Sequence, residues 1–413
     1  MNPEKTIIVG IDWANQDHVF HLQVDGKKPV TGSFKQDPED IQLLIEGWRK
    51  RFPDCAFAIA IETSKGPLIN ALVNYQDVVI YPINPAALAN YRKAFAHGGG
   101  KNDPSDAKLL ADFLQHYRQQ LKPLRRDEPI TRELAALTED RRRLVDQRTA
   151  IGNELKAVLK RYFPAVLELE PAKIYADFLL RLVLKYPTLA AAQRAGKVRL
   201  RKVFYGLGKA EKIEARVEQL MAATPLTDDE TTLRVESRRA VALCELLQTY
   251  NQQIDKYDKS IKELVVQHQD YEIFESLPAG SHATQARLIA ALGDDRSRYE
   301  SAESLQAASG IAPLTTQSGQ QRFVSSRWAC SKFMKQTFHE FAGLSIKGCK
   351  WARAYYAMQR SKGKSSQVAT RALAYKWQRI LFSCWQSRTP YNDEHYMNRL
   401  RATGSPLLSF IEE

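Results

Sequence analysis

Two short apolar runs of the sequence each end in an acidic residue. Ile7 to Ile11 is followed by Asp12, and Ala56 to Ile61 is followed by Glu62. Short runs rich in Ile, Val and Ala are typical of buried strands. Because a charge is costly to remove from water, packing alone rarely places an acid at the end of such a strand. The pattern therefore predicts a buried sheet whose strand ends carry chemically active side chains.

The region from about residue 5 to residue 115 alternates predicted strands with predicted helices. Asp25-Gly26 is typical of a hairpin turn, and apolar positions at helical spacing follow it. A hairpin followed by strand–helix alternation indicates a mixed sheet covered by helices. The expected strands are 7–14, 18–24, 57–62 and 78–83, and the expected helices are 38–51, 68–75 and 85–95.

A second pair of acids, Asp103 and Asp106, lies in the segment KNDPSDAKLLADF. Pro104 and Ser105 can open a helix there, so both acids belong to its first turn. Together with Asp12 and Glu62 they predict a carboxylate cage for Mg²⁺, a hard cation that prefers oxygen ligands. The alternative interpretation is that each acid is a strand-end cap or a surface charge.

Composition limits the class of protein. The chain has 413 residues and a hydrophobic fraction of 44%, enough for two or three domains with real cores. It contains no apolar run long enough to cross a membrane, and its start does not resemble a signal peptide. The five cysteines are scattered without a CxxC pair, so neither a zinc ribbon nor a disulfide framework is predicted. A cytoplasmic location is expected.

The net charge of +13 is concentrated in one C-terminal segment. Between Gln317 and Arg388 there are fourteen Lys or Arg residues and one acid, Glu340, among many aromatic residues. Basic side chains bind phosphates and aromatic rings stack on unpaired bases, so this segment predicts a nucleic-acid partner. A solvated basic face over an aromatic core is the alternative. The candidate nucleic-acid-binding residues are Arg322, Arg327, Lys332, Lys335, Lys362 and Lys364.

Two long helices are predicted in the middle of the chain, at about 132–162 and 237–268. In the second, steps of four and three residues place Leu243, Leu247 and Ile254 on one stripe, as in a coiled coil. The two helices can pair with each other or with a second protomer, and we expect a coiled coil that also assembles subunits. A helical insert of unknown role, about 165–232, separates them. Beyond residue 271 we expect helices, with a loop at 312–327.

These motifs together resemble the DEDD transposases of the Piv-type invertase group. The resemblance rests on the strand before Asp12, on Glu62, on INPA at 83–86, on KNDPSDAKLLADF, and on SLPAGSHATQARLIAALG and ASGIAPLTTQSGQQR near the C-terminus. The motifs occur in the family's order and cover most of the chain. Two features depart from the pattern. The family's Pro-Gly-Ile-Gly turn reads Pro-Ala-Gly-Ser at 278–281, and the insert is longer than in compact members.

The resemblance implies a fold that is α/β plus α. Its parts are an N-terminal RuvC-like (RNase H-type) mixed sheet with helices at 1–125, a coiled-coil region with the insert at 126–270, and a mostly helical transposase domain at 271–413. It implies a Mg²⁺-binding tetrad of Asp12, Glu62, Asp103 and Asp106, and a serine nucleophile, Ser318, with Ser325 and Ser326 as the next candidates. It also implies an insertion-sequence recombinase that works on target and donor DNA and is guided by a bridge RNA. The coiled-coil seam suggests a dimer that can pair into a tetramer.

Two other classes of protein compete with this interpretation. A RuvC-like nuclease or junction resolvase would hydrolyse DNA with the four acids and would need no serine. A non-enzymatic nucleic-acid-binding protein would use only the coiled coil and the basic segment, but it leaves the strand-end acids unexplained.

Overall fold

The computed structural model describes residues 6–24, 26–95, 103–169, 174–205, 210–319 and 321–411. The side chains of Phe95, Asp103, Ser318 and Arg322 lie outside the described part, as do Asp25 of the predicted hairpin turn and the Gly-rich segment before Asp103. The chain divides into two compact units, 1–126 and 127–413, which are described separately. The three-part division expected from the sequence stays a prediction.

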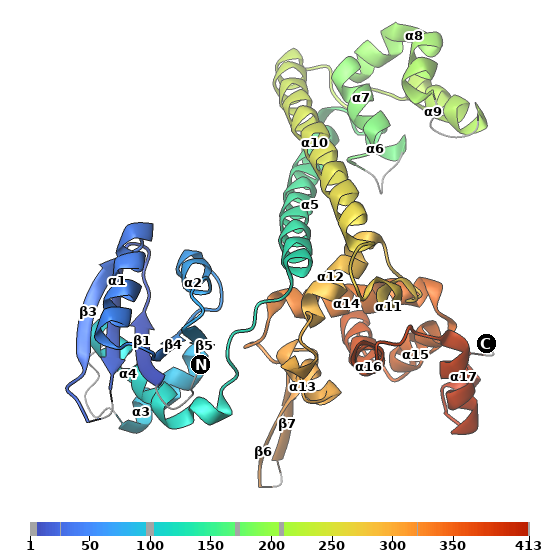
Figure 1. Cartoon of the computed structure of the whole chain (residues 1–413). Coiled ribbons are helices and arrows are strands. Elements are labelled where there is room, and N and C mark those ends of the chain that lie inside the picture. The colour runs from blue at the N-terminus through green and yellow to red at the C-terminus, as the bar shows by residue number, and fades with distance from the viewer. Residues whose placement is uncertain are drawn as a thin grey trace. The chain divides into compact units, whose positions relative to one another are not determined.

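The first unit contains a five-stranded mixed sheet with the strand order β3-β2-β1-β4-β5 (Figure 1). Strands β1, β2 and β3 are antiparallel neighbours, whereas β1, β4 and β5 run parallel. This is the RuvC-like mixed sheet with helices that was predicted. The elements are β1 (Thr6–Asp12), β2 (Asp17–Gln23), β3 (Val30–Lys35), α1 (Pro38–Arg51), β4 (Ala56–Ile61), α2 (Pro67–Leu72), β5 (Val78–Pro82), α3 (Pro85–Phe95), α4 (Asp103–Tyr117) and a short 3-10 helix (Arg118–Gln120).

Alternating side chains of the central strands pack into two different hydrophobic cores. On β1, Ile7, Val9 and Ile11 share one core with apolar residues of α1 and α2. Ile8, on the opposite face, shares the other core with residues of α3 and α4 such as Leu110. A strand buried on both faces reads as a continuous apolar run, which is why β1 and β4 were recognisable in the sequence.

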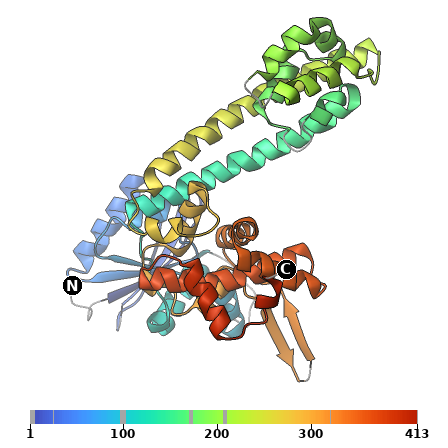
Figure 2. The ribbon, with the colours of Figure 1, turned by 90° about the vertical axis from the view of Figure 1, so that its right-hand side faces the viewer.

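The second unit is mainly helical and is organised around two long helices that lie side by side (Figures 1 and 2). Its elements are α5 (Pro129–Tyr162), α6 (Ala165–Leu169), α7 (Asp177–Lys185), α8 (Leu189–Phe204), α9 (Ala210–Ala222), α10 (Glu230–Val265), α11 (Tyr271–Glu275), α12 (His282–Leu292), α13 (Ala302–Ala308), β6 (Leu314–Ser318), β7 (Gln321–Ser325), α14 (Lys332–Gly348), α15 (Lys350–Ser361), α16 (Ser366–Ser387) and α17 (Asp393–Ala402), with 3-10 turns at Arg296–Arg298 and Leu408–Phe410.

Polar contacts between α5 and α10 show that the two helices are antiparallel. Arg141 Nε donates to Asp258 Oδ1 at 2.6 Å, and Arg161 Nη1, farther along α5, donates to Glu236 Oε1 at 2.9 Å. The apolar stripe predicted on α10 is buried at Leu243, which packs with residues of α5 and of the insert helices. The prediction of long coiled-coil helices is confirmed, and within the chain they pair with each other.

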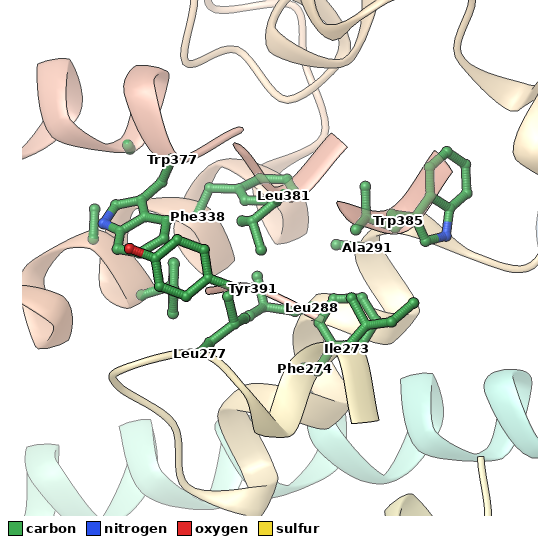
Figure 3. Packing of buried hydrophobic residues seen from close by; sticks show 14 of the residues in the cluster. Ile273, Phe274, Leu277, Leu288, Ala291, Phe338, Trp377, Leu381, Trp385 and Tyr391 are labelled. Atoms are coloured by element: carbon green, nitrogen blue, oxygen red, sulfur yellow. The ribbon is translucent and has the colours of Figure 1, made fainter. Parts of the chain in front are cut away.

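Each end of the α5–α10 pair belongs to a different core. At one end Leu155 and Leu247 pack with the insert helices α6 to α9. At the other end Leu134 and Ile261 pack with helices α11 to α16. The C-terminal core contains several fully buried aromatic residues, among them Trp377, which packs near Phe338, Leu381 and Tyr391 (Figure 3).

One part of the sequence interpretation was wrong about local structure. The segment predicted as a loop at 312–327 contains the antiparallel strands β6 and β7, which form a hairpin (Figure 1). The hairpin was missed because its strands, LTTQS and QRFVS, are mostly polar and show no alternation of apolar and polar residues. None of the helices in the described part of the chain combines the length and the apolar character that crossing a bilayer requires.

Candidate active site and nucleic-acid interface

Asp12 and Glu62 leave adjacent strands at the same edge of the sheet. In the parallel pair β1–β4, Ile11 lies opposite Ile61, so the following residues, Asp12 and Glu62, are the next pair in that register. Asp12 is half-buried and takes part in a polar interaction, whereas Glu62 is exposed. Sheet pairing, which does not depend on side-chain choice, thus brings two of the four predicted acids together.

Helix α4 brings the other two predicted acids to the same edge. A Cβ atom at Gly10 would collide with the backbone oxygen of Ala107 and the backbone nitrogen of Ala111, so α4 crosses β1 in direct contact. Farther along the helix, Asp112 accepts a hydrogen bond from Gln23, which lies opposite Ile8. Helix α4 therefore runs antiparallel to β1, and its first turn, with Asp103 and Asp106, points to the Asp12 end.

Arg92 forms an ion pair with Asp106 that sequence analysis did not predict. Its Nη2 atom donates to Asp106 Oδ1 at 2.6 Å, and the Asp106 side chain is only 11% exposed. Arg92 lies in the last turn of α3, where a basic residue also interacts favourably with the helix dipole. A buried carboxylate needs a partner, and Arg92 supplies one. The sequence carried no signal for this pair, because it forms only when α3 and α4 are neighbours.

The four acids suit a divalent cation by chemistry and by backbone position. Carboxylate oxygens are the ligands that hard cations prefer, and strand ends and a helix start are rigid supports. In the described residues, however, no three His, Cys, Asp or Glu side chains are arranged to hold a metal ion, and the Asp103 side chain is outside that set. The described arrangement is one in which Asp106 is bound by Arg92.

His18 holds the chain directly after Asp12. The backbone N–H of Ala14 donates to His18 Nδ1 at 3.1 Å, and His18 Nε2 contacts Gln36 Oε1 at 3.0 Å. With Nδ1 accepting, the ring is neutral and Nε2 donates. Burial lowers the pKa of His18 below its usual 6.5 because the charged form would lose hydration, which outweighs the opposing effects of Gln36 and Asp17. The neutral ring thus anchors the segment that follows Asp12.

Ser318 ends strand β6 at the tip of the hairpin. Its backbone pairs with Gln321, and Gly319 adopts a left-handed φ of 56° in the turn between them. Apolar side chains are exposed on and after β7, including Phe323 at 64% and Trp328 at 89%. These side chains lie in solvent rather than in the chain's own core, and exposed apolar groups can mark a contact surface.

The two other candidate serines have different surroundings. Ser325 ends β7 and is exposed. The Ser326 hydroxyl accepts a hydrogen bond from Arg371 Nη1 at 2.8 Å, which gives it a structural role between the hairpin and α16. Ser326 is therefore less available as a nucleophile than Ser325, whereas the backbone places Ser318 at the tip of the hairpin.

The predicted nucleic-acid-binding residues fall into two groups. Arg327, Lys332 and Lys335 lie between the hairpin and the first turn of α14, and Lys335 Nζ donates to the Arg327 carbonyl oxygen at 3.0 Å. Lys362 and Lys364 are exposed in the turn between α15 and α16. The Arg322 side chain lies outside the described residues. Five of the six side chains therefore have a described placement that leaves them fully or partly open to solvent and, among the described residues, without a carboxylate partner: Arg327, Lys332, Lys335, Lys362 and Lys364.

Comparison with known proteins adds two family matches. Residues 9–164 match a family model described as a transposase of the DEDD class of IS110, and residues 271–357 match one described as "Transposase IS116/IS110/IS902 family". The first match includes all four acids, and the second includes Ser318.

Several curated proteins are similar to the chain over nearly its whole length. The mini-circle putative transposase for IS117 of Streptomyces coelicolor is 27% identical over 94% of this chain and 96% of its own. An uncharacterized protein of insertion element IS116 of Streptomyces clavuligerus is 28% identical over 91% of this chain and 94% of its own. An uncharacterized protein of insertion element IS110 of Streptomyces coelicolor is 24% identical over 93% and 95%.

Proposed function

Because the chain belongs to the IS110/IS116/IS902 family of DEDD transposases, and is an enzyme of DNA transposition, we propose that it breaks and rejoins DNA strands through a covalent link to Ser318. The observation that carries the proposal is the convergence of four acidic positions on one edge of the sheet in the first unit. Strand register places Asp12 beside Glu62, and the direction of α4 brings its first turn to them.

A DEDD transposase domain acts with divalent metal ions, and we assign Mg²⁺ as the ion. When bound, Mg²⁺ polarises a phosphoryl oxygen and stabilises the attacking and leaving oxygens of a phosphodiester. The residues that would hold it are Asp12, Glu62, Asp103 and Asp106. Asp106 must first exchange its partner, because Arg92 occupies it in the described arrangement. Arg92 is then free to face a phosphate, for which a guanidinium is well suited.

The serine step conserves the energy of the broken bond. The Ser318 hydroxyl oxygen forms a bond to phosphorus, the bond from phosphorus to the leaving strand oxygen breaks, and the hydroxyl proton is transferred to that oxygen. The reverse reaction with another strand end rejoins DNA and releases the serine. No external energy source is needed, and the sequence contains no Walker A motif that would bind a nucleotide.

The experiment that tests the proposal is a search for a covalent protein–DNA adduct after incubation of the full chain with Mg²⁺ and its element-end DNA. The wild-type protein should form an adduct that survives denaturation, and Ser318→Ala should abolish it. Ser325→Ala and Ser326→Ala are matched controls on the same hairpin and should retain it. Full strand cleavage by Ser318→Ala would instead favour a nuclease or resolvase that uses water.

We further propose that the serine of one protomer acts with the acids of another, as the family resemblance implies. The acids and Ser318 belong to different compact units of the chain, and a dimer or tetramer would let them meet in exchanged pairs. An equal mixture of Asp12→Asn and Ser318→Ala proteins should then recover part of the adduct that neither variant forms alone. No recovery in mixed oligomers would place both groups in one protomer.

A transposase binds DNA, and we propose that a bridge RNA selects the sequences. Exposed basic residues such as Lys332 and Lys362 would contact phosphates without reading bases, and base pairing would supply specificity. Purification of the protein from cells followed by sequencing of the bound RNA tests this. One discrete noncoding RNA is expected, and random fragments would contradict guidance by RNA.

A further inference from the structure

A cavity of about 910 Å³ opens on the surface of the C-terminal region, between α15, α16 and the segment that leads into α17. Its volume is at the upper end of the range of about 300–1,000 Å³ that is typical of small-molecule sites. None of the described residues assigned above to catalysis or phosphate binding lines it. The cavity therefore needs an explanation of its own.

Aromatic rings surround a partly buried lysine in this cavity. The Lys376 Nζ atom lies 4.9 Å from the ring centroid of Tyr355 and 5.8 Å from that of Tyr396. Both tyrosines line the cavity. Burial lowers the pKa of Lys376, because its ammonium group has exchanged water for ring faces that only partly replace it. A ligand that brings a negative charge would stabilise this ammonium group in place of the water it has lost.

The cavity wall is basic. Besides Lys376, it includes Arg379, His395 and Arg399, and among the residues that the structure describes no Asp or Glu lines it. Within that same set, Lys376 and Arg399 have no carboxylate within ion-pair distance, and the pair of Arg379 with Glu303 is long, at 3.8 Å, and exposed. A group of cations without counter-charges is suited to an anion from outside.

The floor of the cavity is rigid. Tyr391 lines it, and its hydroxyl accepts a hydrogen bond from Trp351 Nε1 at 2.8 Å and donates to Asp393 Oδ1 at 2.7 Å. The Tyr391 ring packs against Trp377 in the C-terminal core, with centroids 5.3 Å apart (Figure 3). Because the core supports the floor, the cavity is preformed and a ligand need not order it.

From this combination of rings, cations and a rigid floor we infer that the cavity binds one unpaired nucleotide of the nucleic acid on which the protein acts. The base takes the place of the Lys376 ammonium group at the ring face of Tyr355, next to Tyr396, and the released ammonium group faces the phosphate together with Arg399. An acidic peptide would use the cations but not the ring faces, and an apolar ligand would leave the cations unpaired. Only a flat aromatic group joined to an anion uses both features. The inference rests on the proposed function, since it takes nucleic acid to be the partner.

The test measures binding of short single strands of RNA and of DNA to the full chain, with ultraviolet crosslinking to locate the contacted residues. Wild-type protein should crosslink at Tyr355 or Tyr396. Lys376→Met and Arg399→Gln should each weaken single-strand binding about tenfold, the effect expected when one hydrogen bond to a charged phosphate is lost, and should remove those crosslinks. Arg401→Gln is the matched control and should bind like wild type, because Arg401 is exposed on α17, the helix of Arg399, but does not line the cavity.

The outcomes separate the possible ligands and the two proposals. If only the RNA strand or only the DNA strand binds, that result identifies the source of the nucleotide. If adenosine monophosphate alone competes as well as a whole strand does, the rest of the strand contributes little to binding. Unchanged affinity of Arg399→Gln, which is exposed and tolerant, together with crosslinks elsewhere overturns the inference. If such variants still form the serine adduct, only the inference fails. If the wild-type chain binds no nucleic acid at all, the proposed function fails with it. Displacement of the strands by an acidic peptide that binds more tightly would assign the cavity to a protein partner instead.

Discussion

The two units present their chemical groups in opposite ways. In the first unit, the predicted acids are attached to the ends of buried strands and to a helix packed directly on one of them, so the backbone determines where they lie. In the second unit, Ser318 is at the tip of an exposed hairpin, and most of the basic residues project into solvent. The first arrangement is set by packing within one chain, in which Asp106 is paired with Arg92. The second is set by a two-stranded hairpin whose Phe323 side chain is exposed.

This difference explains which groups tolerate change. A site on rigid elements is sensitive to small displacements of its support, whereas a site on a loop or hairpin depends on the residue itself and on its partner. The following predictions apply this contrast, in order of decreasing effect.

Asp12→Asn should abolish DNA strand cleavage, with a loss of at least about a hundredfold in rate, because in the proposed mechanism this carboxylate holds the metal ion and a neutral amide would hold it less well. The fold should be retained, since Asp12 is at a strand end and only half-buried. Cleavage assays beside circular dichroism spectra check this. Glu46→Gln, on the outer helix α1, is the control and should cleave normally. Undiminished cleavage by Asp12→Asn would remove Asp12 from the site.

Gly10→Ala should destabilise the first unit by about 1–3 kcal/mol, the usual cost of forcing atoms into a packed core. Its new methyl group would meet backbone atoms of Ala107 and Ala111, which cannot rotate away, so α4 must shift and carry Asp106 with it. Urea unfolding measures the change.

Gly47→Ala is the matched control for this substitution. Gly47 is exposed on helix α1, and a methyl group added there would have nothing within 4 Å, so the change should leave stability equal or raise it by up to about 1 kcal/mol. If Gly10→Ala were as stable as this control, close packing of α4 on β1 would not be what holds the acids in place.

The contact at Gly10 also shows which features of the fold could be predicted from the sequence and which could not. The apolar runs predicted β1 and β4 because strands buried on both faces have an unambiguous composition, and the four acids were identified from their positions relative to these elements. The contact of Gly10 with α4 could not be predicted, because it depends on how two elements distant in sequence approach each other. Arg92 was missed for the same reason: its role exists only once α3 and α4 are neighbours.

In the second unit the limits were different. Heptad spacing predicted the long helices well, since a regular pattern over many residues is the strongest signal a sequence carries. The polar hairpin of β6 and β7 has no such pattern. The cavity around Lys376 was hidden because its aromatic residues were equally consistent with a core.

Arg92→Gln should increase the affinity of the first unit for Mg²⁺ several-fold. The substitution removes a positive charge that competes for Asp106 and that repels a cation nearby. The shift of the melting temperature on addition of Mg²⁺ should be larger for the variant than for wild type. Arg51→Gln, an exposed change at the end of α1, is the control. An unchanged shift would show that Arg92 does not compete with the metal.

The smallest expected effect is on stability at mildly acidic pH. The pKa of His18 is lowered in the folded protein, so the unfolded chain binds its proton more readily. His18 therefore contributes stability that is fully present above its unfolded pKa of about 6.5 and declines as the pH falls towards its lower folded value. His21, whose pKa burial also lowers, adds to the same trend.

Urea unfolding of wild type and His18→Gln at about pH 7.5 and about pH 5.5 tests this. The variant should lose less stability than wild type over this interval, because one of the two histidines no longer titrates. Equal losses in both proteins would mean that His18 is not responsible for the dependence on pH.

The antiparallel course of α5 and α10 has a consequence for how this chain could change in evolution. With 36 residues, α10 extends for about 54 Å, and the chain departs along α5 and comes back along α10 (Figure 2). The insert helices α6 to α9 have a hydrophobic core that does not include the C-terminal aromatic residues. Residues can therefore be inserted or deleted at the insert end of the helix pair without disturbing the C-terminal core at its other end. Members of a family can thus differ in the length of this helix pair while their chemistry stays the same.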